Sequence, residues 1–379
     1  MHRFPKRLSL QLKLGLLLLF PFVVTSQSTA GAVVASDNST MEDKASTYTY
    51  KLTVKMSNRS AYRSEASFTD KKLLRELQEA APGSAYTEPL LPDTTLSYIS
   101  KDKEQSLSVT PQGEVIDSFT KRLLTVPGDM QERLAAQVTT LRSQHYGELL
   151  PWTEAKDVLP KYSKFTIVDV DSGLSFEGQR RAGSSHADVQ PLTKADSATL
   201  KTIYGGQWSW DRRAVLVKLN GRTLAGSMHG MPHGGDGIPG NDFNGHFCIH
   251  FLGSVTHGSH SLDPAHQLMV QRAAGLLNDY VGKLSPWALI DVWITGANQG
   301  DPQLLQVTTG QEQAVHIRTM RRLSKFPEQD TSKLLQLTTL VDVSATPEGS
   351  NTTRTRRVRF QLERESLEAR WYIRSADIQ

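Results

Sequence analysis

The stretch Gly245-His246-Phe247-Cys248-Ile249-His250-Phe251 decides the architecture of the central part of the chain. Its residues alternate in type, and successive side chains of a β-strand point to opposite faces of a sheet. The pattern therefore predicts a strand whose aromatic and aliphatic residues enter a core. The other face of this strand carries His246, Cys248 and His250, so a thiol lies between two imidazoles on a rigid element.

Histidines are concentrated around this strand. Seven of the eleven histidines in the chain lie between positions 229 and 266. Residues of many types separate them, so the segment differs from a low-complexity tract. We expect a chemical site here, with one loop before the strand and a second polar loop after it lining the same cleft. The clustered residues are His229, His233, His246, His250, His257, His260 and His266.

Cys248 is the single cysteine of the chain, so it has no partner for an internal disulfide. It can be an inert buried thiol, an intermolecular bridge, a metal ligand or a nucleophile. A neighbouring imidazolium lowers the pKa of a thiol, and the thiolate is the reactive form. The glycine-rich segment before the strand can also bring backbone N–H groups close to a substrate oxyanion.

The order of these residues resembles the active site of the L,D-transpeptidase (YkuD-like) family, in which a His-Gly pair and a spacer precede S/T-H-G-C-[IV]-R. Here His229 is followed by glycine, and fifteen residues separate His229 from Gly245. The resemblance implies that Cys248 is the nucleophile and His229 the general base. It implies that His246 orients the site.

Three positions depart from the family pattern, because Gly245 replaces Ser or Thr, Phe247 replaces Gly and His250 replaces Arg. The resemblance covers about residues 165–260. Loss of the arginine implies a changed substrate site, to which a polar loop at 180–188 can contribute. The residues expected to contact the substrate are His250, Gly245, His233, Arg181 and His186.

The same residues support an alternative in which the cluster binds a metal ion, with zinc as the expected cofactor. Three or four nitrogen and sulfur ligands are available, and Asp236 or Asp242 can add a carboxylate. A single cysteine excludes zinc sites that need two thiolates from one chain. The candidate ligands are His229, His233, His246, Cys248 and His250. The nucleophile hypothesis, by contrast, needs no cofactor.

The N-terminus carries the pattern of a secretory signal peptide over residues 1–32. A basic start precedes a short apolar run at 14–24, and Ala30-Gly31-Ala32 forms a small-residue cleavage site. Residues 33–45 read as a flexible leader. We therefore expect a secreted, cell-wall-associated protein with no stable membrane span after signal cleavage.

The rest of the chain predicts an α+β multidomain fold, in which small α+β domains flank a β-rich central Cys/His domain. The expected domains are 46–160, 161–283 and 284–379, and the last resembles the nuclear-transport-factor-like (cystatin-like) modules. Alternation predicts strands at 48–56, 165–170, 214–219, 334–345, 354–362 and 366–374, and a hairpin at 111–113. Helices are expected at 71–80, at 128–144, from Asp263 to Tyr280, and in two stretches after Ser285.

Composition narrows the function further. Of the 379 residues, 38% are hydrophobic and 22% are charged, and this apolar fraction excludes disorder of the whole chain. The formal charge is only +4, which disfavours a nucleic-acid partner.

We expect an enzyme that transfers acyl groups on peptidoglycan stem peptides, or on another cell-envelope polymer. One alternative is a metal-binding envelope protein or metallohydrolase, and another is a non-catalytic envelope binding module.

Overall fold

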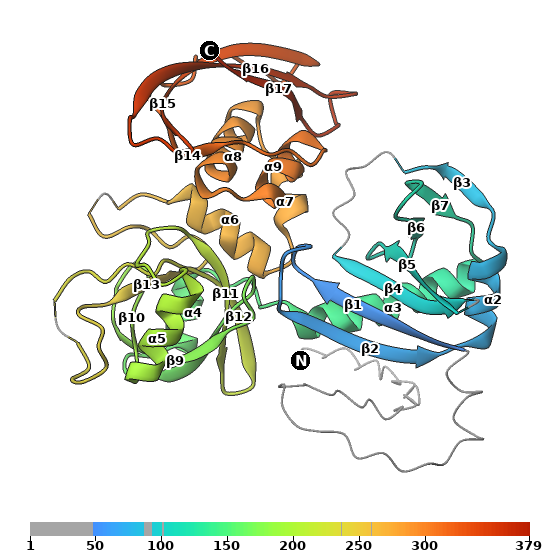
Figure 1. Cartoon of the computed structure of the whole chain (residues 1–379), viewed down its shortest axis with the longest axis horizontal. Helices are drawn as coiled ribbons and strands as arrows, with labels where there is room; N and C mark the ends of the chain where they lie inside the picture. The colour runs from blue at the N-terminus through green and yellow to red at the C-terminus, as the bar shows by residue number, and fades with distance from the viewer. Residues whose placement is uncertain (1–47, 87–92, 101, 236, 259) are drawn as a thin grey trace, which may run out of the picture. The chain divides into compact units, whose positions relative to one another are not determined.

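The computed structural model describes residues 48–86, 93–100, 102–235, 237–258 and 260–379, all of which belong to one compact unit. The predicted signal peptide at 1–32, the leader at 33–45 and Asp236 lie outside the described residues. Figure 1 shows three sheets with helices between and against them. The predicted mixed α and β content, rich in antiparallel strands, is confirmed.

The first sheet is built around strand β1 (Thr49–Lys55), whose alternating burial sends every second side chain into a core. Helix α3 (Gly128–His145) packs on this sheet through a stripe that includes Leu134 and Val138. Helix α2 (Lys71–Glu79) begins at Asp70, whose carboxylate accepts the backbone N–H of Leu73. The strands run in the order β2 (Arg63–Thr69), β1, β4 (Thr94–Ser100), β5 (Lys103–Val109), β6 (Val115–Asp117), β7 (Arg122–Leu124) and β3 (Pro82–Ala85).

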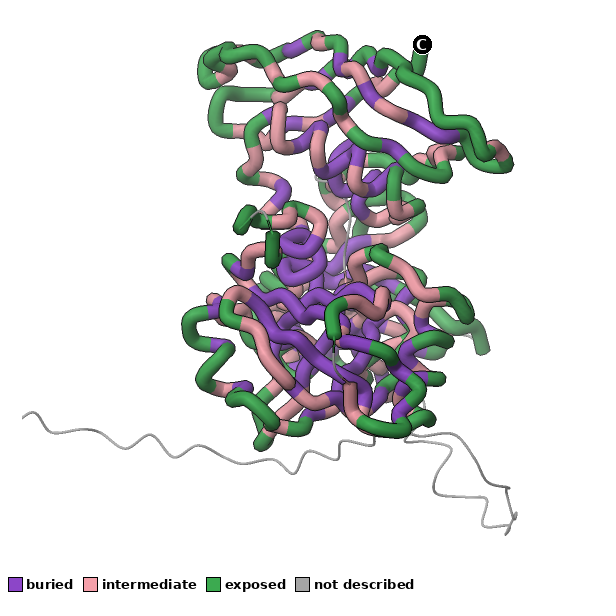
Figure 2. The backbone as a smooth tube through the Cα atoms, turned by 90° about the vertical axis from the view of Figure 1, so that its left-hand side faces the viewer, coloured by how far each residue is buried: buried purple, intermediate pink, exposed green. Residues whose placement is uncertain are grey.

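The central sheet closes on itself as a barrel, and buried residues follow its strands in Figure 2. The predicted inward face of the strand at 245–251 is confirmed, because Phe247, Ile249 and Phe251 lie in the barrel core. Helices α4 (Trp152–Val158) and α5 (Lys194–Ile203) cover this core. The strand order is β10 (Ala187–Pro191), β13 (Phe247–His250), β12 (Arg222–Met228), β11 (Arg213–Leu219), β8 (Lys164–Asp169) and β9 (Ser175–Ala182).

Four helices and a third sheet complete the chain. The helices are α6 (Pro264–Ala273), α7 (Leu277–Gly282), α8 (Pro286–Gln299) and α9 (Pro302–Thr309). Three of them begin with proline after a residue that caps the helix with its side chain, namely Asp263, Ser285 and Asp301. The sheet runs in sequence order through β14 (Ile317–Arg322), β15 (Gln336–Pro347), β16 (Arg354–Glu363) and β17 (Tyr372–Ile378).

The hydrophobic core does not divide at residue 283, where a domain boundary was predicted. One core includes Leu216 and Ala225 of the barrel, Met269 of α6, and Trp293 and Phe360 further along the chain. Helix α6 provides the connection, because it packs on β11 and β12 and also contacts α8. Helix α4, predicted to belong to the region 46–160, packs into the barrel core instead. The division into three domains stays a prediction.

Several predicted elements differ in detail from the structure. The helix expected from Asp263 to Tyr280 is interrupted at Gly275, whose φ of 72° is left-handed and where the Tyr146 ring leaves no room for a Cβ. The loop expected at 180–188 is the end of β9, a turn and the start of β10. The last strand begins at Tyr372 rather than 366. No helix among the described residues has the length and apolar character needed to cross a membrane.

A buried ion pair joins two barrel strands. The side chain of Asp169 in β8 is fully buried and receives hydrogen bonds from Nε and Nη2 of Arg213 in β11, both at 2.7 Å. The backbone N–H of Ser172 donates to the same carboxylate at 2.8 Å. A buried carboxylate that loses its cation keeps its desolvation cost, so this pair constrains the barrel more strongly than a surface pair does.

We predict that Arg213→Met, which keeps most of the aliphatic stem, lowers the free energy of unfolding by about 3 kcal/mol or more. The matched control is Arg222→Met, because Arg222 pairs with Glu148 on the surface, where both side chains are more than 40% exposed. The control should cost less than about 1 kcal/mol. Urea unfolding of both variants checks this, and equal losses would contradict the prediction.

Burial also makes folding sensitive to pH at His145. Its Nδ1 lies 3.0 Å from the Ser64 hydroxyl, and its buried Nε2 has no hydrogen-bond partner within the described ranges. Burial, together with the nearby cations of Arg142 and Lys218, lowers the pKa of His145 to about 3. The folded state therefore favours the neutral ring, while the unfolded chain binds a proton near pH 6.5.

The contribution of His145 to stability is complete above about pH 6.5 and is lost as the pH falls toward 3. We predict that the wild-type protein loses about 2 kcal/mol more stability between pH 7 and pH 5 than His145→Phe, which retains an aromatic ring. Urea midpoints at the two pH values measure this difference. His316→Phe, at an exposed histidine, should behave as the wild type does, and equal pH slopes for His145→Phe and the wild type would refute the prediction.

Candidate functional site

The pairing of β13 with β10 determines the centre of the site. Cys248 in β13 lies opposite Asp188 in β10, and the cysteine is 2% exposed. On the other side of β13, His250 lies opposite Ser227 of β12. Cys248 and His250 therefore each have a side chain of a neighbouring strand beside them, Asp188 of β10 and Ser227 of β12.

His233 reaches the thiol from the segment after β12. The backbones of His233 and His246 exchange hydrogen bonds of 3.0 and 2.9 Å, which hold this segment against the start of β13. Gly245 is required at this bridge, because its φ is 100° and a Cβ would lie 2.3 Å from the carbonyl oxygen of His233. The Nε2 atom of His233 then lies 3.4 Å from Sγ of Cys248, and its Nδ1 donates to the carbonyl of Met231 at 3.0 Å.

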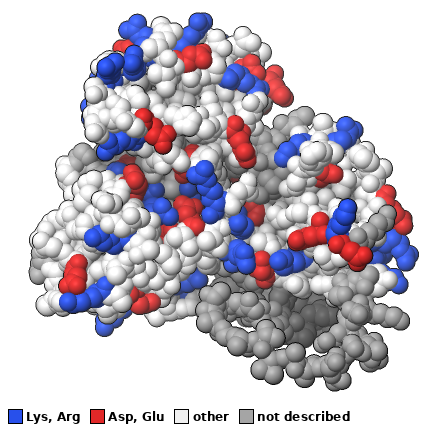
Figure 3. Space-filling view, in the orientation of Figure 1, with Lys and Arg blue, Asp and Glu red and all other residues white. Residues whose placement is uncertain are grey.

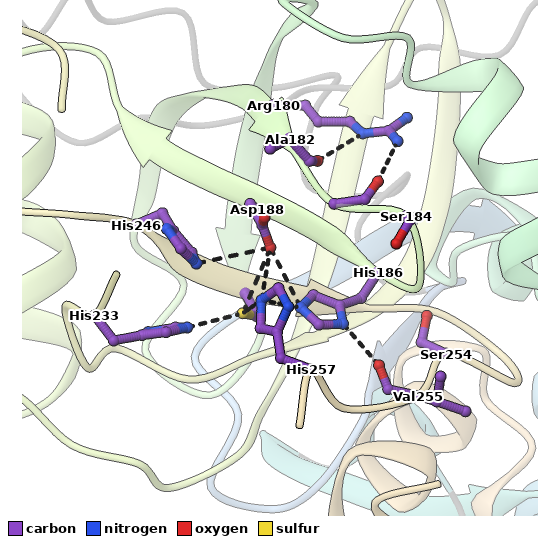
Figure 4. Close-up of polar contacts among 12 residues, drawn as sticks. Arg180, Ala182, Ser184, His186, Asp188, His233, His246, Ser254, Val255 and His257 are labelled. Atoms are coloured by element: carbon purple, nitrogen blue, oxygen red, sulfur yellow. Dashed lines mark hydrogen bonds and ion pairs between the residues drawn. The ribbon is translucent and has the colours of Figure 1, made fainter. Parts of the chain in front are cut away.

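Two further histidines approach from the opposite side. His257, in the loop after β13, has its Nε2 3.1 Å from Oδ1 of Asp188 and 3.9 Å from the sulfur of Cys248. His186, just before β10, has its Nε2 2.9 Å from the same nitrogen of His257. Its Nδ1 donates to the carbonyl of Val255 at 2.7 Å, which fixes the ring. Figure 4 shows these rings converging on Asp188 and the sulfur atom.

The side chain of His246 completes the cluster. Its Nε2 lies 3.8 Å from Oδ1 of Asp188 and is buried with no hydrogen-bond partner among the described residues. An unpaired buried ring nitrogen carries a desolvation cost that a ligand can remove. The nitrogen points toward the side chain of Asp188 (Figure 4). His246 also offers a donor atom within 4.8 Å of the sulfur of Cys248, so it is available to a ligand bound between these two residues.

The donor atoms lie close enough together to surround a single ion. One set contains His233, His246, Cys248 and His257, and its four donor atoms all lie within 4.8 Å of one another. A second set of His186, Asp188, Cys248 and His257 meets the same limit. Imidazole and thiolate are the ligands that zinc takes in proteins. The residues present therefore fit a zinc-class ion.

Burial controls the protonation of the cluster. It raises the pKa of the Cys248 thiol, and the nearby Asp188 carboxylate raises it further. Burial lowers the pKa of His246 and of His250. Burial also opposes ionisation of Asp188, but the hydrogen bond from His186 and the nearby imidazoles hold its pKa below the usual range. The protein alone thus favours a neutral thiol at Cys248 and neutral rings at His246 and His250, and a bound cation would favour the thiolate.

His229, expected to be the general base, lies elsewhere. Its ring centroid is 4.6 Å from that of Trp210 and 5.2 Å from that of His233, and no hydrogen bond joins it to Cys248 among the described residues. The chain turns at Gly230, where the Tyr204 ring packs against the backbone, and it reaches the thiol only at His233. His233, expected to contact the substrate, therefore has the position predicted for the base.

His250 lies behind the cluster rather than in it. Its ring stacks on His186 at 4.5 Å and on His266 at 3.8 Å, and His266 is hydrogen-bonded to the hydroxyl of Ser227 at 2.8 Å. These stacked rings fill the space beneath His186. His250 thus belongs to neither set of candidate metal ligands, although the sequence placed it in one.

The arginines of the predicted loop do not reach the thiol. Arg180 is buried and donates to backbone carbonyls, including those of Leu159 and Gly183. Arg181 donates to Gln179 and lies over the ring of Tyr162, so its predicted contact with substrate has no support from its position. Asp242, the described carboxylate of the proposed metal set, is exposed and pairs with Lys194 at 3.3 Å.

Two residues of the cluster were not among the predicted site residues. Asp188 was part of the expected polar loop, and its role follows only from its register opposite Cys248. His257 was expected to line the cleft, and the signal for it was its membership in the histidine-rich segment. No protein-family model, no curated protein and no solved structure matches this chain.

We predict that iodoacetamide alkylates Cys248 of the metal-free protein at least about tenfold more slowly than it alkylates free cysteine at pH 7, because burial favours the protonated thiol. The rate should rise with pH without levelling off below pH 9. Labelling with iodoacetamide in the presence of a chelator measures this, and the urea-unfolded protein is the control for the intrinsic rate. A fast reaction that levels off below pH 7 would instead indicate an activated thiolate.

Proposed function

We propose that this protein binds a zinc-class metal ion with His233, His246 and Cys248, that the exposed His257 leaves the fourth position open to water, and that the ion is used for hydrolysis. The observation that supports the proposal most directly is the convergence of four nitrogen and sulfur donors, from three separate segments, within 4.8 Å of one another. A zinc ion coordinated by protein and water supplies a nucleophilic hydroxide near neutral pH and polarises a carbonyl group.

The surroundings of the donors support this proposal. Metal-binding imidazoles usually donate their second nitrogen to a carbonyl or carboxylate, which fixes their tautomer. His233 has this arrangement through the carbonyl of Met231, at 3.0 Å. The buried Nε2 of His246 has no hydrogen-bond partner in the described part of the chain, and a metal ion would accept its lone pair. A cation would also offset the cost of ionising the buried thiol of Cys248.

The cluster offers more donors than a four-coordinate ion needs. Asp188 and His186 lie beside His257, at 3.1 and 2.9 Å, and can hold or transfer a proton there. The side chain of His257 is 51% exposed, so water or a substrate can approach on this side. An accessible ligand position and an adjacent carboxylate are features of catalytic rather than structural zinc sites.

The substrate class that we propose follows from the expected location of the protein. The N-terminal pattern predicts export, and a secreted hydrolase of this kind would act on peptidoglycan or another cell-envelope polymer. Figure 3 shows Lys and Arg interspersed with Asp and Glu over the face in view. This mixed surface suits a polymer of mixed polarity better than a nucleic acid.

A second candidate function is cysteine acyl transfer of the L,D-transpeptidase kind. It is favoured by the contact between Cys248 and His233 at 3.4 Å and by the carbonyl that orients His233. In this proposal the base is His233 and not His229. The burial of the thiol, which raises its pKa, weighs against it. The alkylation experiment separates the two, because an activated thiolate reacts quickly without metal.

We predict that the metal-free protein binds one Co²⁺ or Zn²⁺ ion, and that bound Co²⁺ shows the intense near-ultraviolet absorption of thiolate coordination. Cys248→Ser should abolish that absorption, and His246→Ala should weaken affinity by at least about 100-fold, since removal of a ligand costs more than removal of its supporting residue. Titration by absorbance and by calorimetry measures both effects.

Two control variants show whether the loss is specific. His229→Gln removes a histidine that the sequence suggested as a ligand but that lies outside both donor sets. His316→Ala removes an exposed histidine that directly precedes β14. Both should bind metal within about threefold of the wild type, since neither removes a donor. Equal binding by Cys248→Ser, His246→Ala and the controls would refute the proposed site.

A further inference from the structure

A second feature lies next to the cluster and is not explained by it. A groove of about 450 Å³ opens between the segment at 211–212, the start of α6, one side of α8 and the end of β14. This volume is within the range of ligand-binding pockets. The wall formed by β14 and the residues after it includes Arg321, Arg322 and Lys325.

The charges of the groove are only partly neutralised. Arg212 pairs with Asp263 at 2.6 Å, and Arg322 pairs with Asp291 through two contacts of 2.8 and 3.0 Å. Two other cations of the lining, Arg321 and Lys325, have no carboxylate partner among the described residues.

The lining also includes the carboxylate of Asp211, on the barrel side of the groove. This carboxylate accepts a hydrogen bond from the hydroxyl of Ser209 at 2.8 Å. The side of β14 thus presents the unpaired positive charge. An anionic group of a ligand would be attracted to that side.

Trp210 connects the groove to the histidine cluster. Its ring centroid lies 4.6 Å from that of His229 and 5.3 Å from that of His233, while 48% of the residue is exposed. The next two residues, Asp211 and Arg212, line the groove. The segment is anchored at both ends, because the carbonyl of Ser209 accepts the N–H of Gly230 and the N–H of Arg212 donates to Gln299.

We infer that the groove binds a carboxylate-bearing peptide segment and that Trp210 lies between this segment and the metal centre. Arg321 and Lys325 provide the charge complementarity, and the exposed tryptophan provides an apolar surface on which a peptide packs. The assignment of this segment as a substrate rests on the proposed function. Binding in the groove does not, because none of these residues is a metal ligand.

The test measures binding of a fluorescein-labelled hexaglutamate peptide to the metal-free protein by fluorescence anisotropy, with hexaglutamine as the uncharged probe. The wild type should bind hexaglutamate more tightly than hexaglutamine, and the affinity should fall with added salt. The double variant Arg321→Glu/Lys325→Glu should bind hexaglutamate about tenfold more weakly or worse, since it reverses both unpaired charges.

The matched control is Arg356→Glu/Arg359→Glu, which makes the same charge change on exposed residues of β16 outside the groove. It should stay within about twofold of the wild type, because a distant charge is screened by salt. Absence of hexaglutamate binding, equal binding of hexaglutamine, or equal losses in the two double variants would overturn the inference.

The two proposals fail in different ways. Cys248→Ser removes a metal ligand but leaves the groove intact, so hexaglutamate binding by this variant should match the wild type. Conversely, Arg321→Glu/Lys325→Glu should retain Co²⁺ binding. Co²⁺ binding by Cys248→Ser at the wild-type level would therefore show that the proposed metal site is wrong, and hexaglutamate binding by Arg321→Glu/Lys325→Glu at the wild-type level would show that the proposed groove is wrong.

Discussion

The pairing of β10 with β13 is the interaction on which the rest of the site depends. It closes the barrel and places Cys248 opposite Asp188. The core side of β13 is filled by Phe247 and Ile249, and a shift of one residue would exchange the two faces of the strand. Packing of the barrel core therefore selects the register, and the register brings the thiol to the carboxylate. The chemistry of the site is a consequence of ordinary hydrophobic packing.

Burial then changes the pKa values of the ionisable groups at this centre. The thiol and several imidazoles are removed from water, which favours their neutral forms, while Asp188 stays ionised. An ionised carboxylate and a thiol surrounded by imidazoles form a site that a bound cation would stabilise. The groove beside Trp210 has the opposite character on the side of β14, where the cations Arg321 and Lys325 have no carboxylate partner among the described residues. The proposed metal site and the proposed anion-binding wall are thus separate parts of the protein.

The shared core explains why the domain boundaries were harder to predict than the elements. Strands and helices with strong periodicity, such as β1, α2, α3 and β8, lie close to their predicted bounds. The boundary at 283 was drawn at a proline that starts α8, but α6 packs on both the barrel and α8. A local signal in the sequence marks where a helix begins. Which neighbours the helix then covers depends on side chains that are far apart in the chain.

The sequence by itself determined the two faces of β13, the caps of α6 and α8, and the segment in which the histidines gather, because each follows from local periodicity or from a residue's own backbone preference. Only the tertiary structure decided that His233 rather than His229 contacts the thiol, that His250 lies in a stacked column, and that Asp188 and His257 join the centre. These outcomes depend on strand register and on the path of loops held by the His233–His246 backbone bridge. Such contacts are set by packing across the whole barrel, so they cannot be predicted from the spacing of residues along the chain.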